Sequence, residues 1–270
     1  GDLQAMRELC RQRFYIIDMA SDLKRKVIAL LDQVFPEYEK LFSDSFGLSS
    51  MELLSQYTTP EEMLSVSSQQ LAEVLKKASR GRLGAEKAVE IQDAAKNSFG
   101  IVMASSSFSP IIRQYIEQIR SLESSVDIFD TEIARLLSGF DTQLTTITGI
   151  GSTLAAVILS EIGGDIRRFS SPAKLAAYAG VDPTVKQSGD FSGTRIKMSK
   201  RGSPYLRRAI WLASTVAAFK DPVIHALYER KRAEGKDHMT VIGHVCRKMI
   251  SIIFAVLRDN TPYVPAGISD

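Results

Sequence analysis

The chain has 270 residues, of which 44% are hydrophobic and 24% charged, and its formal net charge is +3. These proportions are typical of a soluble globular protein and exclude both a disordered chain and one made mainly of membrane spans. The length favours two units, each with its own core.

Apolar spacing predicts two long helices in the first half of the chain. Residues 3–42 are expected to form a helix that Pro36 ends or kinks, because apolar residues recur there at 4-3-4 spacing: Leu23, Val27, Leu30 and Val34. A second stripe has the spacing of a coiled-coil seam and comprises Ile112, Ile116, Ile119, Leu122, Val126, Phe129, Ile133 and Leu136. This seam needs a partner helix, either residues 3–34 of the same chain or another protomer. We expect an antiparallel hairpin whose tip keeps enough free seam for a dimer contact.

Between these helices, shorter elements follow from capping signals. Thr59-Pro60-Glu61-Glu62 predicts a helix start, with a hydroxyl cap, a proline and acids in the first turn. Further helices are expected over Ser68–Lys77 and Ala85–Asn97, joined by the turn Arg80-Gly81-Arg82-Leu83-Gly84. This turn is either purely structural or a second element that binds nucleic-acid backbone. Ser138-Gly139 ends the seam helix, so the predicted domains are a helical oligomerisation arm, 1–139, and a second domain, 140–270.

The second domain is predicted to be helical with one small β-hairpin. Two short helices flank Gly149–Gly151, and others cover Pro172–Ala179, Pro204–Phe219 and Thr240–Arg258. The hairpin is expected to pair Val181–Val185 with Thr194–Met198 around a glycine-containing loop. The fold class is therefore mainly α: a long coiled-coil-like arm plus a helical domain with a helix-hairpin-helix and a β-hairpin.

Charge is distributed unevenly. Residues 166–258 carry 18 Lys or Arg against six Asp or Glu, a balance of +12, so the total of +3 leaves −9 for the rest of the chain. Such asymmetry indicates that only the second half meets a polyanion, or else that this half has a solvated basic face.

The first candidate for a phosphate contact is Gly149-Ile150-Gly151. Two glycines let the backbone turn tightly at a helix N-terminus, where amide groups hold phosphate oxygens well. Leu144, Ile147 and Ile150 would lock the turn onto the next helix, and Ala155 would permit close helix packing. The pattern is that of a helix-hairpin-helix that contacts DNA backbone, or of a helix corner without a ligand.

The second candidate is a serine loop rich in glycine and cations. Ser188 precedes Gly189, and cations that suit a charged phosphate transition state follow or flank it: Lys186, Arg195, Lys197, Lys200 and Arg201. Arg207 and Arg208 most simply hold phosphates. Ser203, before Pro204, is better explained as a helix cap.

Other chemistries have little support in the sequence. The three histidines, His225, His238 and His244, are too sparse for a metal site, and no acid–His pair accompanies Ser188. Cys10 and Cys246 are interpreted as reduced thiols of a cytoplasmic protein. The longest apolar run, Met249–Leu257, is too short to span a bilayer and predicts a buried helix, and no secretory signal is present.

These segments together resemble one known group. Gly149-Ile150-Gly151, Glu161-Ile162-Gly163, residues 169–183 (FSSPAKLAAYAGVDP), 187–189 (QSG) and 200–208 (KRGSPYLRR) are similar to the C-terminal transposase domain of the IS one-ten insertion-sequence family. The similarity runs in order from Leu144 to Pro262. The first half of the chain resembles that family's coiled-coil arm more loosely.

The resemblance implies a recombinase guided by a structured RNA and acting on DNA as a homo-oligomer. It implies that Ser188 attacks a DNA phosphodiester to give a transient phosphoserine, with Ser192 as the nearest alternative nucleophile. It also implies an N-terminal ribonuclease-H-fold domain with four acidic ligands for Mg²⁺. No acidic, β-rich segment of that kind is present here, so this chain is expected to need no cofactor itself, to bind nucleic acid and not to recombine alone. The alternatives are a non-catalytic nucleic-acid-binding and dimerisation module and a junction-binding repair protein.

Overall fold

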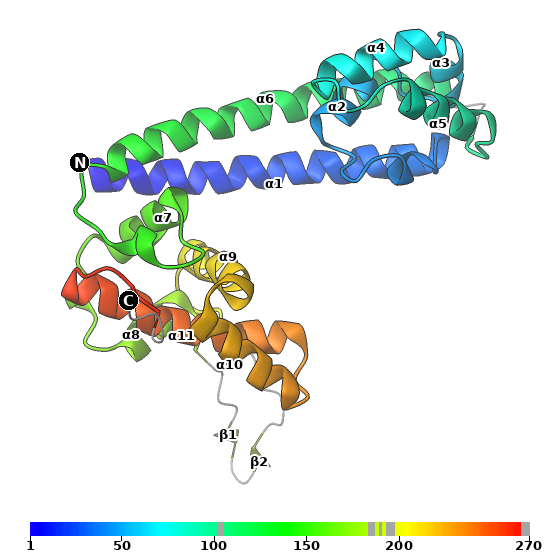
Figure 1. Cartoon of the computed structure of the whole chain (residues 1–270). Helices are drawn as coiled ribbons and strands as arrows, with labels where there is room; N and C mark the ends of the chain where they lie inside the picture. The colour runs from blue at the N-terminus through cyan, green and yellow to red at the C-terminus, as the bar shows by residue number, and fades with distance from the viewer. Residues whose placement is uncertain (102–104, 183–186, 189–190, 193–197, 266–270) are drawn as a thin grey trace. The chain divides into compact units, whose positions relative to one another are not determined.

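The structure is a computed structural model that describes residues 1–101, 105–182, 187–188, 191–192 and 198–265. It is mainly α-helical, as predicted (Figure 1). The chain forms two compact units: an arm unit, Phe14–Asp127, and a basic unit, which combines Gly1–Arg13 with Ile128–Asp270. The first part of α1 and the last part of α6 are grouped with the second half of the chain, and the domain boundary expected at residue 139 stays a prediction.

The arm unit is built from helices of very different length. Its elements, with the long helices given in full, are α1 (Asp2–Val34), the 3-10 turn η1 (Tyr38–Lys40), α2 (Leu48–Gln56), α3 (Pro60–Leu64), α4 (Ser68–Ala78), α5 (Ala85–Lys96) and α6 (Ser105–Leu137). The predicted cap at Thr59 is confirmed, since its side chain accepts a hydrogen bond from the Glu62 amide and Pro60 opens α3.

The predicted seam packs within the chain over its arm portion. Ile112, Ile116 and Ile119 are fully buried, and they share one core with Val27 and Leu31 of α1. An ion pair between the Lys24 Nζ and Glu123 Oε1 atoms, 2.7 Å apart, joins the same two helices. The hairpin is therefore intramolecular and leaves no free seam at its tip.

The next two seam positions in the arm unit are only half-buried. Leu122 and Val126 follow Ile119 on α6, and Val126 lines a shallow hollow together with Ile17 and Ala20 of α1. Partly exposed seam surface thus lies along the arm, at Leu122 and Val126.

The basic unit surrounds one long apolar helix. Its further elements are η2 (Leu144–Thr146), α7 (Ser152–Ile162), η3 (Ile166–Arg168), α8 (Pro172–Ala179), β1 (Gln187–Ser188), β2 (Phe191–Ser192), α9 (Pro204–Lys220), α10 (Pro222–Ala233) and α11 (His238–Asp259). Helix α11 contacts α8, α9 and α10. It is long and apolar enough to cross a membrane by length and composition alone, but half of its apolar window is buried inside the unit. The buried helix predicted at Met249–Leu257 is confirmed as the core of this unit.

The β-structure of the loop is small. Strands β1 and β2 are antiparallel, with Gln187 opposite Ser192 and Ser188 opposite Phe191. The predicted strands lie further from the loop tip. Val181 and Asp182 are outside any strand, and residues 183–186 and 193–197 lie outside the described residues, so the longer hairpin stays a prediction.

Candidate nucleic-acid interface

The two ends of the serine loop are hydrogen-bonded to each other. Three backbone bonds join them: Ser203 N–H to Tyr178 O at 2.9 Å, Lys200 N–H to Gly180 O at 3.0 Å and Ser199 N–H to Asp182 O at 2.9 Å. The Ser199 hydroxyl also donates to the Asp182 carboxylate. We call these paired segments, 178–182 and 199–203, the stem. Because the stem is closed, the loop that carries Ser188 leaves and re-enters the unit at one place.

Two glycines allow the stem to close. Gly202 has a φ of +111°, and a Cβ atom there would lie 2.0 Å from the Tyr178 carbonyl oxygen. Gly180 has a φ of +68°, and a Cβ atom there would lie 2.9 Å from the Arg201 amide nitrogen. No side chain fits at either position, so both glycines are needed for packing as well as for conformation.

Lys200 occupies a strained position in this stem. Its φ is +53°, in the left-handed region where a residue with a Cβ is disfavoured by roughly 1–2 kcal/mol. The side chain is exposed, as is that of Arg201. A cation in a conformation that favours glycine or asparagine makes Lys200 a candidate for a functional contact.

The stem brings a third cation to the same place. The Arg207 guanidinium donates to the Ala179 carbonyl oxygen at 3.3 Å and approaches within 2.7 Å of the position that a Gly180 Cβ would occupy. Arg207 therefore has a structural contact in addition to its predicted phosphate contact. Arg208 is half-buried on the same turn of α9. Lys200, Arg201 and Arg207 thus gather around Gly180.

The other predicted loop residues are less fully described. Lys186, Arg195 and Lys197 lie outside the described residues. Of Ser188, the structure gives the backbone, which pairs with Phe191 in the short ladder. Its predicted role as nucleophile therefore stays a prediction.

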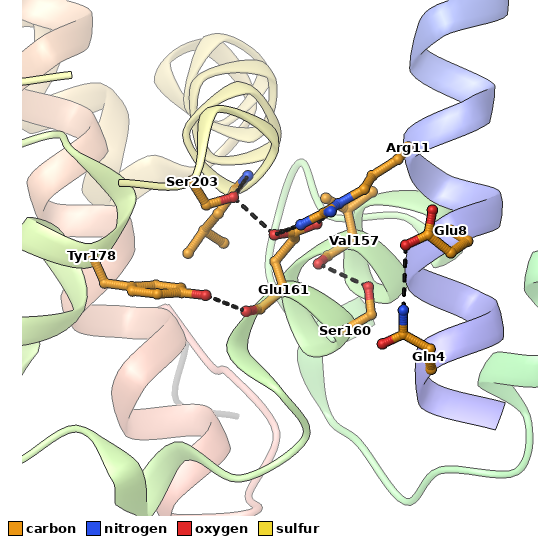
Figure 2. Close-up of polar contacts among 9 residues, drawn as sticks. Gln4, Glu8, Arg11, Val157, Ser160, Glu161, Tyr178 and Ser203 are labelled. Carbon is orange, nitrogen blue, oxygen red and sulfur yellow. Dashed lines mark hydrogen bonds and ion pairs between the residues drawn. The ribbon is translucent and has the colours of Figure 1, made fainter. Parts of the chain in front are cut away.

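A buried carboxylate fixes the start of α9 (Figure 2). The Ser203 hydroxyl accepts from the Leu206 amide at 3.1 Å, which confirms the predicted cap, and donates to Glu161 Oε2 at 2.9 Å. Glu161 is only 2% exposed. It also binds Arg11 through two bonds, from Nε at 2.7 Å and from Nη2 at 3.1 Å. One carboxylate therefore holds α1 and the N-terminus of α9 against α7.

Aromatic residues complete this cluster. The Arg11 guanidinium lies 4.8 Å from the centre of the Tyr205 ring, a cation–π contact. The Tyr178 hydroxyl donates to the backbone carbonyl of Glu161 at 3.0 Å, which ties α8 to α7 (Figure 2). Hydrogen bonding to Glu161 raises the pKa of Arg11 above its ordinary value. The cluster anchors both helices from which the stem extends.

Sequence reasoning assigned no role to Glu161 or Arg11. A signal was present, because Glu161 is the one charged residue in the mostly apolar helix STLAAVILSEI. A lone acid on a buried helix requires a partner. The sequence does not show which cation supplies it, since Arg11 is far away along the chain.

Gly149 and Gly151 have different structural roles. Gly149 has a φ of +89°, and a Cβ there would lie 2.5 Å from the Ala213 carbonyl oxygen, so α9 packs directly on this backbone. Gly151 is the exposed cap of α7, with an ordinary φ of −81° and open space around its missing side chain. Only Gly149 is required by the fold.

The apolar anchors of this turn are confirmed. Leu144, Ile147, Ile150 and Ala155 are each at most 3% exposed. The helix expected before the turn is a single 3-10 turn, η2, so the helix-hairpin-helix assignment stays a prediction. Gly149 packs on Ala213, and the cation Arg207 precedes Ala213 on α9 by roughly 9 Å along the helix axis.

Substitution of the two glycines should separate folding from binding. Gly149→Ala is expected to lower the free energy of unfolding by about 2 kcal/mol or more, through left-handed strain and the clash with α9. Gly151→Ser should leave stability unchanged or raise it, because serine is a better helix cap. If the Gly151 backbone approaches a phosphate, this variant will nevertheless bind DNA more weakly. Urea unfolding and fluorescence anisotropy test both; equal destabilisation by the two variants would contradict the assignment.

The described residues do not fit a metal centre. Among them, no group of three or more His, Cys, Asp or Glu side chains lies close enough to hold an ion. The acids nearest the stem already have partners, since Asp182 accepts from Ser199 and Glu161 binds Arg11 and Ser203. Burial raises the pKa of the Cys10 thiol to about 12 and that of Cys246 to about 11, so both disfavour the thiolate that binds metals.

Comparison with known proteins gives a consistent result. Residues 141–229, which contain the glycine turn, the stem and α9, match the model of the Transposase IS116/IS110/IS902 family. The insertion element IS900 uncharacterized 42 kDa protein of Mycobacterium paratuberculosis is 28% identical over 84% of this chain and 57% of its own length. The insertion element IS110 uncharacterized 43.6 kDa protein of Streptomyces coelicolor is 28% identical over 93% of this chain and 64% of its own.

A third relative has a different description. A pilin gene-inverting protein of Moraxella bovis is 30% identical over 54% of this chain and 48% of its own length. The chain spans less than two thirds of the length of each of these relatives. The resemblance expected from the sequence is confirmed: residues 141–229 match the model of the Transposase IS116/IS110/IS902 family, and insertion-element proteins are similar over most of this chain.

Proposed function

We propose that this chain is part of a DNA transposase or site-specific recombinase, in which the basic unit binds nucleic-acid backbone and supplies a serine nucleophile. The observation that carries the proposal is the closed stem, which gathers Lys200, Arg201 and Arg207 at the base of the loop that contains Ser188. The relatives support DNA rearrangement as the class of activity, since they include insertion-element proteins and a gene-inverting protein.

In the proposed reaction, the Ser188 hydroxyl oxygen attacks the phosphorus of a DNA phosphodiester. A bond forms between serine oxygen and phosphorus, the bond to one sugar oxygen breaks, and the hydroxyl proton passes to solvent or to the departing oxygen. Attack by a sugar hydroxyl of the recipient strand then reverses these bond changes and releases the serine. The stem cations would stabilise the additional negative charge on the pentacoordinate phosphate.

Phosphate contacts of this kind give affinity without sequence choice. We therefore place target selection outside the stem, with the structured guide RNA that the family resemblance implies. Mg²⁺ would likewise be held by the ribonuclease-H-fold domain of that resemblance, since the described carboxylates here do not fit it. On this proposal the chain by itself binds nucleic acid but does not exchange strands, and the enzyme works in the cytoplasm.

We also propose that the protein acts as a homo-oligomer. The half-buried seam positions Leu122 and Val126 support this on the arm unit. On the basic unit, α9 exposes apolar residues at 4-3 spacing, Leu212, Val216 and Phe219, which are 42%, 47% and 55% exposed. A compact monomer in sedimentation at high protein concentration would contradict association.

The binding step is tested by its dependence on salt. Lys200→Gln with Arg201→Gln should flatten the slope of log affinity against log salt by about 0.9 for each duplex phosphate that the variant no longer binds. Arg167→Gln is a control in the same unit that removes one charge, because Arg167 is 86% exposed, is paired with Asp165 and is not part of the stem segments. The proposal loses its basis if the salt slope changes equally in the two proteins, or if it changes in neither.

The second candidate function is a non-catalytic nucleic-acid-binding and dimerisation module. The stem cations fit it equally well, since phosphate binding needs no nucleophile. The two functions differ in the fate of Ser188, because only a recombinase forms a covalent bond between this residue and DNA.

A further inference from the structure

The turn between α4 and α5, with the end of α4, carries a cluster of exposed positive charge in the arm unit. Residues 74–85 contain no carboxylate, and the cations Lys76, Arg80 and Arg82 within this stretch are all exposed. The arm unit as a whole is acidic, with 12 basic and 16 acidic residues and a net charge of −4. General solubility does not require such a cluster in an acidic unit.

The cations of this turn are not neutralised within the unit. Most other cations there have carboxylate partners within 4 Å, as in the pairs Arg25–Asp22 and Lys96–Asp93. In the described part of the chain, no ion pair involves Lys76, Arg80 or Arg82. The Arg82 side chain donates a 3.3 Å hydrogen bond from Nε to the Ser79 carbonyl oxygen. We exclude the neighbouring Lys77, because it lines a hollow with Glu52 and Glu123.

The turn is well defined by its packing. Fully buried side chains hold α4 against α5: Leu71, Leu75, Ala88 and Ile91. The Gly81 amide donates to the Lys76 carbonyl oxygen at 2.8 Å, and the Leu83 amide donates to the Ser79 hydroxyl at 2.8 Å. The cations therefore project from a fixed backbone, which lowers the entropy cost of holding a ligand there.

Arg80 adds an independent observation. Its φ is +55°, in the left-handed region, where asparagine or glycine would be less strained. Lys200 on the stem has a φ of +53°. In both places an arginine or lysine occupies a strained position beside a glycine and a second arginine. Strain of this type is retained where the side chain has a task.

We propose that this cationic turn, formed by Lys76, Arg80 and Arg82, is a second nucleic-acid-binding surface that holds the phosphodiester backbone of a duplex without reading its sequence. A protein partner fits less well, because residues 76–86 expose no large apolar or aromatic side chain of the kind that forms the centre of protein interfaces. Guanidinium groups match phosphate geometry with paired hydrogen bonds. The inference rests on the proposed function only in taking nucleic acid as the partner.

The test compares two triple variants of the full chain. Lys76→Gln, Arg80→Gln and Arg82→Gln together remove the turn's charge, whereas Arg25→Gln, Lys40→Gln and Lys96→Gln remove the same charge from exposed positions elsewhere in the arm unit. Affinity is measured over a series of salt concentrations for a random-sequence DNA duplex and an RNA duplex of equal length. The turn variant should lower affinity and flatten the salt slope by about 0.9 for each DNA phosphate that it no longer binds.

The outcomes show whether the phosphodiester backbone that the turn holds belongs to DNA or to RNA. Loss of affinity confined to the DNA probe assigns the turn to DNA, and loss confined to RNA assigns it to an RNA helix; both support the inference. Behaviour equal to the control variant on both probes overturns it. Lys200→Gln and Arg201→Gln are also added to each protein, so that failure of this inference can be told apart from failure of the proposed function. The stem variants report on the basic unit alone, and the turn's effect on the slope should persist in their presence.

A single substitution makes the test sharper. Arg80→Asn should raise the thermal midpoint of the protein by relieving left-handed strain and should weaken duplex binding at the same time. A turn with only a structural role would gain stability without losing affinity. That combination, unchanged binding with unchanged or higher stability, would overturn the inference even if the triple variant folded poorly.

Discussion

Replacement of Ser188 by alanine is expected to abolish strand cleavage while leaving DNA binding nearly unchanged. The experiment uses a protein that has the full length of the relatives. The substitution removes the attacking oxygen but no charge, and the stem cations that hold the phosphate stay in place. Loss of a catalytic nucleophile lowers rates by up to about 10⁶-fold in well-studied serine enzymes. Denaturing gels with end-labelled DNA measure both cleavage and any covalent phosphoserine adduct.

Ser192 is the matched control for this experiment. Like Ser188 it precedes a glycine, and its backbone lies opposite Gln187 in the same short ladder. Full activity of Ser188→Ala with loss in Ser192→Ala would move the nucleophile to Ser192. Cleavage by both single variants and by the double variant would end the serine mechanism and favour the non-catalytic binding module.

Loss of the Arg11 guanidinium is expected to cause the largest change in stability. Arg11→Met leaves Glu161, which is only 2% exposed, without its cation. Removal of one partner from a buried pair typically costs about 3–5 kcal/mol, and the lower end applies here because the Arg11 side chain is 33% exposed. Adding Glu161→Gln should restore much of the stability, since no unpaired charge is then buried.

Urea unfolding of the two single variants and the double variant measures this coupling directly. Asp22→Asn is the control, because the Asp22–Arg25 pair is exposed and should contribute little. Additive effects of the two substitutions would show that Arg11 and Glu161 do not act as a pair. A further expected result is weaker DNA binding by Arg11→Met, since the cluster also anchors the Ser203 cap below the stem.

Local patterns explain which features could be predicted. The helix caps at Thr59 and Ser203 and the anchors Leu144 and Ile150 follow from short-range sequence rules, and the structure confirms them. The apolar seam of α6 also followed from spacing, but spacing alone does not identify the helix against which the seam packs. Burial of Ile112 with Val27 shows that the partner is α1 of the same chain.

The remaining features depend on contacts between distant parts of the sequence. The pairing of Arg11 with Glu161 joins residues 150 positions apart, and no local rule selects it. The reason for glycine at position 149 is likewise distant, because the constraint is the approach of Ala213 on α9. The role of Ser188 rests on the family resemblance, since side-chain chemistry alone does not separate it from Ser192.

The closed stem has a consequence for how related proteins can diverge. Its ends meet through three backbone hydrogen bonds and two glycines, all within residues 178–182 and 199–203. The entropy of closing a loop rises only with the logarithm of its length, and a doubling costs about 0.6 kcal/mol. We therefore expect that related proteins can keep the two stem segments while the loop between them differs in length and sequence.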